Sequence, residues 1–239
     1  MYRHYHPTRR VRAWAACLLL GFALVGAAHA QSRNLAPGFS GLPKDAKVIV
    51  APLDVELFSM SAGGVLEPRA DWTAAAQTHM KNALQSKAQR LGLGTGDLDE
   101  KAADDFAELI SLHAAVARSI ALHHAGALKL PTKDGKLEWT FGDVLHPLQL
   151  RTGARFGLFT WVRDSYASAE RKAMMIGMAI LGVGITGGAQ VGYASLVDLE
   201  TGQVLWFNQL VRASGDLRED KPAAESVDAL LAGFPAAVQ

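Results

Sequence analysis

The sequence predicts an α/β (α+β) protein: a single domain with a mixed, largely antiparallel sheet, helices packed on it and a helical insertion. Three observations carry this prediction. An early strand pattern over 47–58 is followed by two long helical patterns. A run over 155–162 is apolar on both faces, as a central strand requires. The chain then closes with a hairpin pattern over 191–211 and a further helix.

The composition is that of an ordinary globular protein. The chain has 239 residues, 24 Lys plus Arg against 23 Asp plus Glu, 49% hydrophobic residues and one cysteine. These values exclude collagen-like, strongly disordered and disulfide-framework classes. The near-neutral charge also lacks the basic excess of a nucleic-acid-binding protein, so no nucleic acid is expected as a partner.

Residues 1–30 have the pattern of a secretory signal peptide. Four arginines and no acid precede the uncharged run Ala13 to Val25, and Ala28-His29-Ala30 places small residues where signal peptidase reads them. The sequence therefore predicts cleavage after Ala30 and a periplasmic location. Two alternatives are a retained anchor, for which about 13 apolar residues are too few to span a bilayer, and a lipid anchor on Cys17, which lies inside the apolar run. Outer-membrane association stays open.

Cleavage would change the chemistry of the remaining chain. The formal charge falls from +1 to −3, because four arginines leave, and the single cysteine leaves with them. Without cysteine the mature chain has neither a disulfide, nor a thiolate metal site, nor a cysteine nucleophile. Residues 31–45 are rich in Ser, Gly and Pro and predict a flexible linker, and residues 46–235 predict the α/β domain.

The amino-terminal half predicts one strand and two long helices. The strand pattern covers 47–58, and Pro52 removes a hydrogen-bond donor, so the strand is at an edge there or is broken in two. Asp71 is the expected cap of a helix whose buried stripe runs from Trp72 to Leu91. A second helix is expected from Asp99 to Ala125. The expected buried residues of that helix are Phe106, Leu109, Ile110, His113, Ala117, Ile120 and Ala121.

The remaining elements follow from turn signals and periodicity. Residues 128–140 predict a small hairpin around Lys133-Asp134-Gly135-Lys136, and residues 142–153 predict a short helix. Strands are expected over 155–162, 191–198 and 203–211, with Gly202 supplying positive φ between the last two. A helix over 222–234 closes the chain along Ala224, Val227, Leu230 and Leu231.

The segment Ala173 to Val197 contains no charged residue. It has the length of a transmembrane span, but Arg163, Arg171 and Lys172 precede it, which opposes the usual orientation in an exported chain. The alternatives are a buried core helix and an arm that contacts a partner or a membrane. Methionine and aliphatic side chains suit such adaptable contacts. The candidate contact residues are Met174, Met175, Ile176, Met178, Ile180 and Leu181.

Catalytic, cofactor and metal motifs are weak in this sequence. Residues 182–187 match G-x-G-x-x-G but lead into a strand, whereas a dinucleotide site needs the motif to open a helix. His113 and His124 share a helix face yet are about 16 Å apart, too far to bind one metal ion. We therefore expect no catalytic, cofactor or metal residues. The enzymatic alternative is a hydrolase that uses scattered groups such as Asp54, Glu56 and His79.

The hairpin carries a resemblance to known families. It reads V-D-L-E-T-G-Q-V-L-W from Val197 to Trp206, and it follows an early strand from Val48 to Leu53. This order resembles the α/β domain of the curli-secretion lipoproteins, the lipoprotein activators of penicillin-binding proteins and the TolB amino-terminal domain. It is also similar to a group of uncharacterised exported proteobacterial proteins. The sequence has no lipobox, unlike the lipoproteins.

The resemblance implies a non-enzymatic accessory or scaffolding role in the bacterial envelope. The expected partner is an envelope protein or a second copy of the chain, and peripheral membrane contact is a further alternative. An oligomeric pore component that inserts into the membrane is the remaining hypothesis.

Overall fold

The computed structural model describes residues 33–91, 93–97 and 106–236. The chain divides into two units, Met1–Arg33 and Asn34–Gln239, and the second unit is described below. The predicted signal peptide lies outside the described residues. So do residues 98–105, where the second predicted helix was expected to begin.

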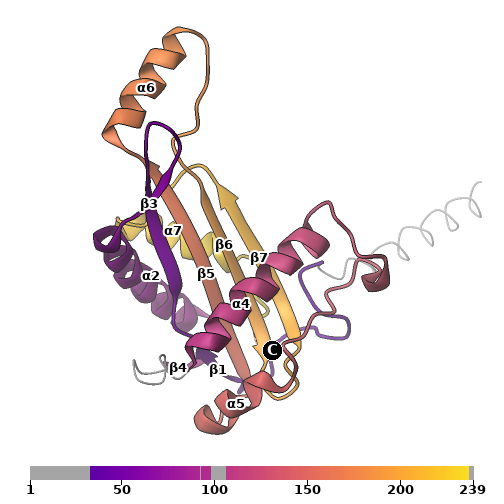
Figure 1. Ribbon diagram of the computed structural model, residues 1–239. Helices are drawn as coiled ribbons and strands as arrows, with labels where there is room; N and C mark the ends of the chain where they lie inside the picture. The colour runs from indigo at the N-terminus through magenta and orange to yellow at the C-terminus, as the bar shows by residue number, and fades with distance from the viewer. Residues whose placement is uncertain (1–32, 92, 98–105, 237–239) are drawn as a thin grey trace, which may run out of the picture. The chain divides into compact units, whose positions relative to one another are not determined.

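The described residues form a seven-stranded mixed sheet (Figure 1). Its strands are β1 (Lys47–Val50), β2 (Asp54–Met60), β3 (Leu66–Pro68), β4 (Gly94–Asp97), β5 (Phe156–Ala167), β6 (Gln190–Asp198) and β7 (Val204–Arg212). The strand β5 is parallel to β1 and β2, and antiparallel to β6, which pairs in turn with β7. More residues are in antiparallel pairs than in parallel ones, which confirms the predicted mixed, largely antiparallel sheet.

The strands β1 and β2 lie along β5 one after the other. Val50 is opposite Leu158, and Asp54 is opposite Trp161. The segment that connects β1 to β2 therefore has one more residue than β5 over the same stretch. Pro52 falls in that irregular stretch, where its missing N–H group is not needed by the ladder. The prediction that Pro52 breaks the strand in two is confirmed.

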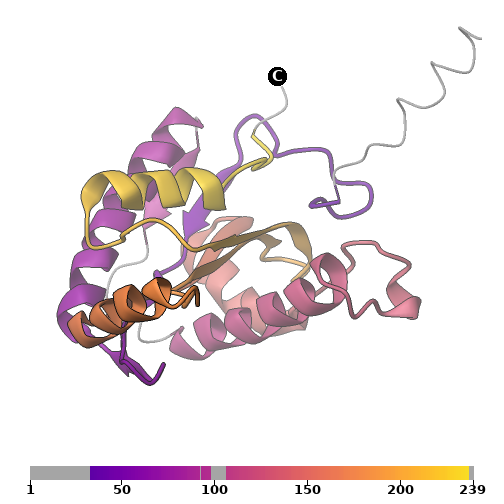
Figure 2. The same cartoon turned by 90° about the horizontal axis from the view of Figure 1, so that it is seen from above.

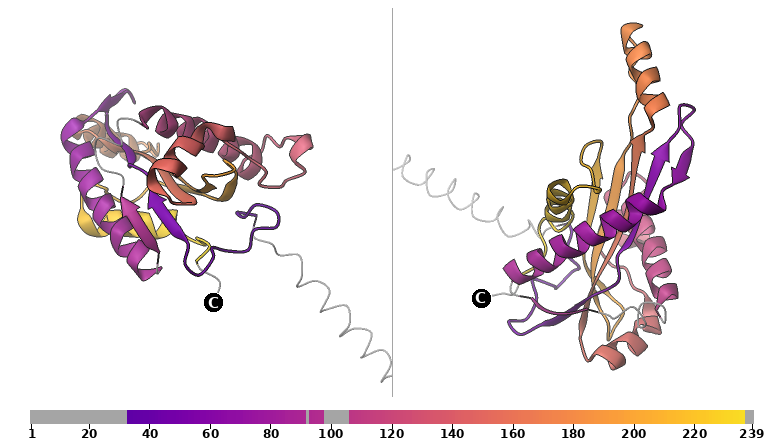
Figure 3. Two further views of the ribbon diagram at one scale, coloured as in Figure 1. Left: turned by 90° about the horizontal axis from the view of Figure 1, so that it is seen from below. Right: turned by 90° about the vertical axis from the view of Figure 1, so that its left-hand side faces the viewer.

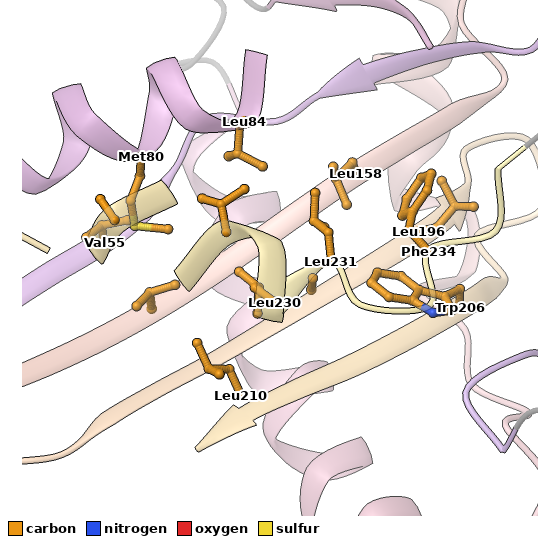
Figure 4. Close-up of a cluster of buried hydrophobic side chains, with 14 of the residues drawn as sticks. Val55, Met80, Leu84, Leu158, Leu196, Trp206, Leu210, Leu230, Leu231 and Phe234 are labelled. Carbon is orange, nitrogen blue, oxygen red and sulfur yellow. The ribbon is translucent and has the colours of Figure 1, made fainter. Parts of the chain in front are cut away.

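Helices cover both faces of the sheet (Figure 2). The helices are α2 (Ala70–Arg90), α4 (Ala107–Ile120), α5 (His146–Thr152), α6 (Ala169–Ile180) and α7 (Asp220–Leu230). One core lies between the sheet and α2 with α7, and includes Met80, Leu84, Leu158, Trp206 and Leu230 (Figure 4). A second core lies under α4 on the other face.

The central strand β5 contributes to both cores because successive side chains of a strand point to opposite faces. Leu158 and Val162 belong to the core beneath α2, while Phe159 and Trp161 belong to the core beneath α4. The prediction of a central strand that is apolar on both faces is therefore confirmed. The strand is longer than expected, because it continues to Ala167 along β2.

The described part of the predicted linker is instead packed on the domain. Leu42 is fully buried in the core beneath α2. Leu35 forms a bridge with Trp206, and Ala36 N donates to Leu205 O at 2.9 Å. The prediction of a flexible linker was wrong because Ser, Gly and Pro indicate turns, which also occur in packed segments. The apolar side chains of Leu35 and Leu42 hold this segment against the domain.

The first long helix is confirmed, but its predicted cap is wrong. The stripe of Ala76, Met80, Leu84 and Ala88 is buried. The helix begins at Ala70, so Asp71 lies inside the first turn, where it accepts hydrogen bonds from Arg69. A carboxylate in the first turn still faces the positive end of the helix dipole.

Four of the seven predicted buried residues of the second long helix are buried, whereas Phe106, Leu109 and Ile110 are half-buried. His113, Ala117, Ile120 and Ala121 are buried, but the regular helix ends at Ile120. Residues Ala121–Ala125 form a π-helical turn, which Gly126 N closes on Ala121 O at 2.7 Å.

The predicted hairpin over 128–140 is wrong, although its turn is present. Asp134 and Gly135 both have positive φ, and Pro131–Lys133 is a 3-10 turn. The second strand of the expected hairpin pairs instead with the turn between β6 and β7. Val204 N donates to Trp139 O and Phe141 N donates to Gly202 O, each at 2.9 Å. Burial of Leu137 in the core beneath α4 accompanies this choice.

The carboxy-terminal elements are confirmed. The short helix appears as a 3-10 turn followed by α5, and β6, β7 and α7 match their predicted ranges to within a few residues. The buried face of α7 includes Ala223 in place of Ala224, and it keeps Val227, Leu230 and Leu231. Gly202 has φ +70°, as its turn position requires.

Gly202 offers a direct test of this architecture. A Cβ atom there would come within 2.1 Å of Gly142 O, whereas Gly38, with a similar φ of +79°, meets no described atom within 4 Å. We expect Gly202→Ala to lower the free energy of unfolding by about 3 kcal/mol and Gly38→Ala by about 1 kcal/mol. Urea denaturation measures both, and equal losses would contradict the close contact between the two turns.

Candidate functional site: an exposed arm and the polar cleft at its root

The connection between β5 and β6, residues 168–189, is far longer than the sheet requires; we call it the arm. The last pair of the ladder is Asp164 with Gln190. Beyond it, Ser165 N donates to Ala189 O at 3.2 Å, and Ala189 N donates to Ser165 Oγ at 3.0 Å. The chain therefore leaves and returns at adjacent points, where a two-residue turn could close the hairpin.

The helix α6 occupies most of the arm and extends beyond the end of the sheet (Figure 3). Ser168 caps it, since its Oγ accepts from Arg171 N at 3.2 Å. Arg171 is the buried residue of the helix: its Nε donates to Thr186 O at 2.9 Å, and its Nη1 to Ser61 O and Ala62 O at 3.3 Å. One guanidinium thus ties the helix to the returning chain and to the turn between β2 and β3.

The two sides of α6 have different surroundings. Met174, Met175 and Met178 are half-buried, and the end of Met175 lies where a Cβ atom at position 187 would meet it, 3.2 Å away. On the outer side, Ile176 is 67% exposed and Ile180 is 81% exposed. Leu181, just after the helix, is also exposed. The six predicted contact residues are therefore brought together on one element, three half-buried and three exposed.

The structure decides between the alternatives for the uncharged segment. The interpretation as a buried core helix is wrong, because the apolar side chains of α6 do not join either core. Within the described residues, no helix is both long enough and apolar enough to cross a membrane. What remains is an arm with an exposed apolar side.

A cleft of about 340 Å³ lies at the root of the arm. It is bounded by the ends of β5 and β6, the first turns of α6 and the loop 213–218. Gly188 is the tightest point of its wall: φ is +150°, and a Cβ atom would lie 1.8 Å from Ser165 O. Only glycine lets the returning chain pass this close to β5.

Asp164 is the centre of a hydrogen-bond network beside this cleft. Its Oδ2 accepts from Tyr166 Oη and from Gln190 Nε2, each at 2.7 Å, and its Oδ1 accepts from Ser165 N at 2.8 Å. Gln190 Oε1 accepts in turn from Arg212 Nε at 2.7 Å. The network therefore links β5, β6 and β7 where the arm begins and ends.

The loop 213–218 is attached to the same network. Tyr166 Oη accepts from Leu217 N at 2.7 Å while it donates to Asp164. The guanidinium of Arg218 lies 4.2 Å from the ring centre of Tyr166 and 4.5 Å from that of Trp72, and it pairs with Asp216 at 2.6 Å. The two rings and Asp216 together stabilise the position of Arg218 in this wall of the cleft.

Burial shifts the protonation of this cluster. Desolvation raises the pKa of Asp164 from 3.8 to about 6, against the lowering effect of its hydrogen bonds. Desolvation, with the neighbouring Asp164, also raises the pKa of Tyr166. The hydrogen bond from Arg218 lowers the pKa of Asp216. Three donors already occupy three of the roughly four lone-pair sites of Asp164, so the carboxyl holds its neighbours in position.

The groups proposed for a hydrolase are not brought together. Asp54 and Glu56 both pair with Arg163, at 2.6 and 3.2 Å. They alternate along β2 with Val55 and Leu57, which pack beneath α2, and so they face the opposite side of the sheet from α2. His79 lies on α2 itself, near Asp220. These three groups therefore form no common pocket.

The remaining motifs also separate in the structure. Residues 182–187 of the G-x-G-x-x-G match run from the end of α6 toward β6 and open no helix. His113 is buried, with Nε2 3.0 Å from Ser195 Oγ and its ring stacked on Phe141 and Phe159. Among the residues that the structure describes, no group of His, Cys, Asp and Glu could hold a metal ion.

Sequence reasoning missed the network around Asp164. A charged residue two positions after an apolar strand pattern looks like the end of the strand, although β5 continues past it. Gln190 lies 26 residues away and becomes its neighbour only through the β5–β6 register. The available signal was the pair Tyr166 and Ala167, which follows Asp164. Apolar and aromatic residues on both sides of a charged residue indicate that the charged residue lies within a strand.

These features define a class: an α/β domain with an exposed apolar arm inserted between two central strands. No family model matches the sequence, and no curated protein sequence matches it. Solved structures show a distant likeness.

The PelC dodecamer from Paraburkholderia phytofirmans is 14% identical over 84% of this chain and 94% of that chain, with a TM-score of 0.35. Lipoprotein GNA1162 from Neisseria meningitidis is 14% identical over 70% of this chain and 81% of that one, with a TM-score of 0.29. The LpoB C-terminal domain from Salmonella enterica is 13% identical over 74% and 87%, with a TM-score of 0.27. A lipoprotein is thus among them, but likeness at this level carries no argument about function.

The raised pKa of Asp164 predicts how stability depends on pH. The folded state binds this proton more tightly than the unfolded state, so the carboxylate costs stability above pH 6 and the cost disappears as the pH falls toward 4. The difference between 3.8 and about 6 corresponds to about 3 kcal/mol. Relative to Asp164→Asn, the native chain should gain up to about that amount between pH 7 and pH 4, as urea denaturation measures.

His113 sets the opposite trend in both chains. Burial lowers its pKa to about 3, so acid protonates the unfolded state first and destabilises the fold as the pH falls below 6.5. The comparison with Asp164→Asn cancels this contribution, since both chains carry His113. A difference between the two chains that does not change with pH would show that Asp164 is not held in a desolvated site.

Proposed function

We propose that this protein is a non-enzymatic accessory or scaffolding protein of the bacterial envelope that binds a protein partner through the arm. The observation that carries the proposal is the exposed apolar side of α6, on a segment that the sheet does not need. Ile176, Ile180 and Leu181 lie in solvent at the end of the domain. Contiguous exposed apolar side chains of this kind mark interaction surfaces.

The position of the arm in the fold supports this reading. Apart from Arg171, no residue of α6 is buried, so the helix adds little to either core. A helix that contributes little to folding still loses conformational entropy when it is ordered. Its apolar content is understandable if binding a partner removes that surface from water, which gives about 1.5–3 kcal/mol for each large aliphatic side chain.

The predicted envelope location rests on residues 1–30. Their basic start, short apolar run and Ala28-His29-Ala30 support export and cleavage after Ala30. In that compartment the mature chain carries no thiol, and its arm would meet other exported proteins. Periplasmic residence is therefore part of the proposal.

A non-enzymatic role is supported by how the polar groups are used. Asp54 and Glu56 are paired with Arg163, and Asp164 is hydrogen-bonded by its neighbours. The candidate groups of the hydrolase alternative lie on different sides of the sheet. Each charged group considered for catalysis thus has a structural partner in the fold.

Photo-crosslinking in cells tests the proposal directly. A photoreactive amino acid at Ile180 should give a discrete protein adduct, whereas one at Leu150, which is 70% exposed on α5, should not. Ile176→Asp in the same chain should reduce the Ile180 adduct at least about tenfold, because it places a charge in the apolar contact. Adducts only with lipid, or the same adducts at both positions, would overturn a protein partner.

Removal of the arm gives an independent prediction. Replacing 169–187 with a short glycine–serine loop should change the free energy of unfolding by no more than about 2 kcal/mol, because the cores are untouched. A photoreactive residue at Leu66, which is exposed near the arm root, serves as the probe in both chains. Every specific adduct that it forms in the native chain should be lost in the shortened variant. A domain that unfolds without the arm would show that the arm serves the fold instead.

A further inference from the structure

We infer that a second copy of this chain binds along the exposed side of α6, with the two helices antiparallel about a two-fold axis. This inference rests on the proposed function, because it names one partner of the arm. It follows from the spacing of the exposed side chains, their sizes and the absence of charge.

The exposed side chains of the arm have the spacing of a helix–helix seam. Ala173, Ile176 and Ile180 follow one another along α6 at intervals of three and four residues, and all three are exposed. Such alternation averages 3.5 residues and keeps a seam facing a neighbouring helix. Arg171 and the half-buried methionines lie on the opposite side of α6, where they contact the rest of the chain.

The seam is self-complementary in size. Small residues, Ala173 and Gly177, alternate on this side with the large Ile176 and Ile180. If a two-fold axis passes between positions 176 and 177, Ile176 faces Gly177 of the second copy. In the same register Ile180 faces Ala173 of the second copy, and each contact occurs twice, as in an isologous interface.

Close approach of the two helices is possible at these positions. No described atom lies within 4 Å of a Cβ built on Gly177, so the space beside it is open in the single chain. Small residues let helix backbones approach and receive the large side chains of the facing helix. Each isoleucine would thereby cover a position that is empty in the monomer.

Charge does not oppose this pairing. No charged residue occurs from Ala173 to Val197, so two identical surfaces meet without repulsion between like charges. Antiparallel helices also place opposite ends of their dipoles side by side. A partner selected by salt bridges would require charges that this part of the arm lacks, whereas a second copy requires none.

The pairing is expected to be weak and concentration-dependent. The twelve-residue helix is about 18 Å long, and a stable interface commonly buries about 800 Å² on each partner. A contact of this length alone is smaller than that. The dimer should therefore form in the micromolar range or above and dissociate on dilution.

Two single-cysteine variants test the register. In the full chain with Cys17→Ser, an equimolar mixture of Ala173→Cys and Ile180→Cys should give a covalent dimer on mild oxidation, because these positions face each other. Neither variant alone should do so, since equivalent positions would lie about 10 Å apart along the axis, beyond the reach of a disulfide. Rapid linkage of Ala173→Cys alone would indicate parallel helices and overturn the inference.

Sedimentation velocity on variants of the seam gives the second test. Gly177→Leu should weaken the dimer at least about tenfold by filling the position that receives Ile176, although it makes the arm more apolar. Leu150→Asp, at an exposed apolar position outside the arm, is the matched control and should leave the dimer unchanged. A stronger dimer for Gly177→Leu would indicate unspecific apolar adhesion and overturn the inference.

The two proposals fail in different ways. A chain that is monomeric at every concentration, yet gives an Ile180 adduct with another envelope protein, overturns the second copy and keeps the protein partner. A chain that forms the cross-linked dimer supports both. Absence of both the dimer and the adduct overturns both.

Discussion

The strand β5 is the constraint on which the rest of the structure depends. It has neighbours along both edges, β1 and β2 on one side and β6 on the other, and its side chains enter both cores. Because this strand is buried, backbone N–H and C=O groups left without a partner along either edge would cost free energy. The break at Pro52 meets that demand, because it lets two short strands follow β5 over most of its length.

The arm lies just beyond this constraint. β5 and β6 stop pairing at Asp164 and Gln190, and residues 168–189 then run outside the sheet. The hydrogen-bond network at this point connects three strands and the loop 213–218. A buried carboxyl with a raised pKa costs stability at neutral pH. In return, it accepts hydrogen bonds from three donors where the chain leaves and returns.

The arm is attached to the domain at its root through hydrogen bonds from Arg171. Arg171 fixes the helix to the turn after β2 and to the returning chain, while Ile176 and Ile180 on the outer side of α6 are mostly exposed. A binding surface that is already ordered does not lose conformational entropy again when a partner binds. The contact proposed for the exposed apolar side would therefore carry a smaller entropic cost than one made by an unstructured loop.

Likeness to solved structures does not replace this reasoning. The resemblance that the hairpin from Val197 to Trp206 suggests is an expectation from sequence, and the solved structures add only a distant likeness. The identities of 13–14% and TM-scores below 0.4 leave the arm and its root as the features on which function is argued. Both features are local to this chain and open to direct tests.

The sequence by itself determined the class of fold, most helices and strands, and the charge-free arm, because periodicity and turn residues act within a few positions of each other. Tertiary structure alone decided the rest. The hairpin over 128–140 gave way to pairing with the β6–β7 turn, and Leu35 and Leu42 joined the domain. Asp164 met Gln190 only through strand register, and α6 lies outside both cores, which other elements form. Local pattern cannot specify which of several apolar segments is left outside, since that depends on the space the whole chain leaves.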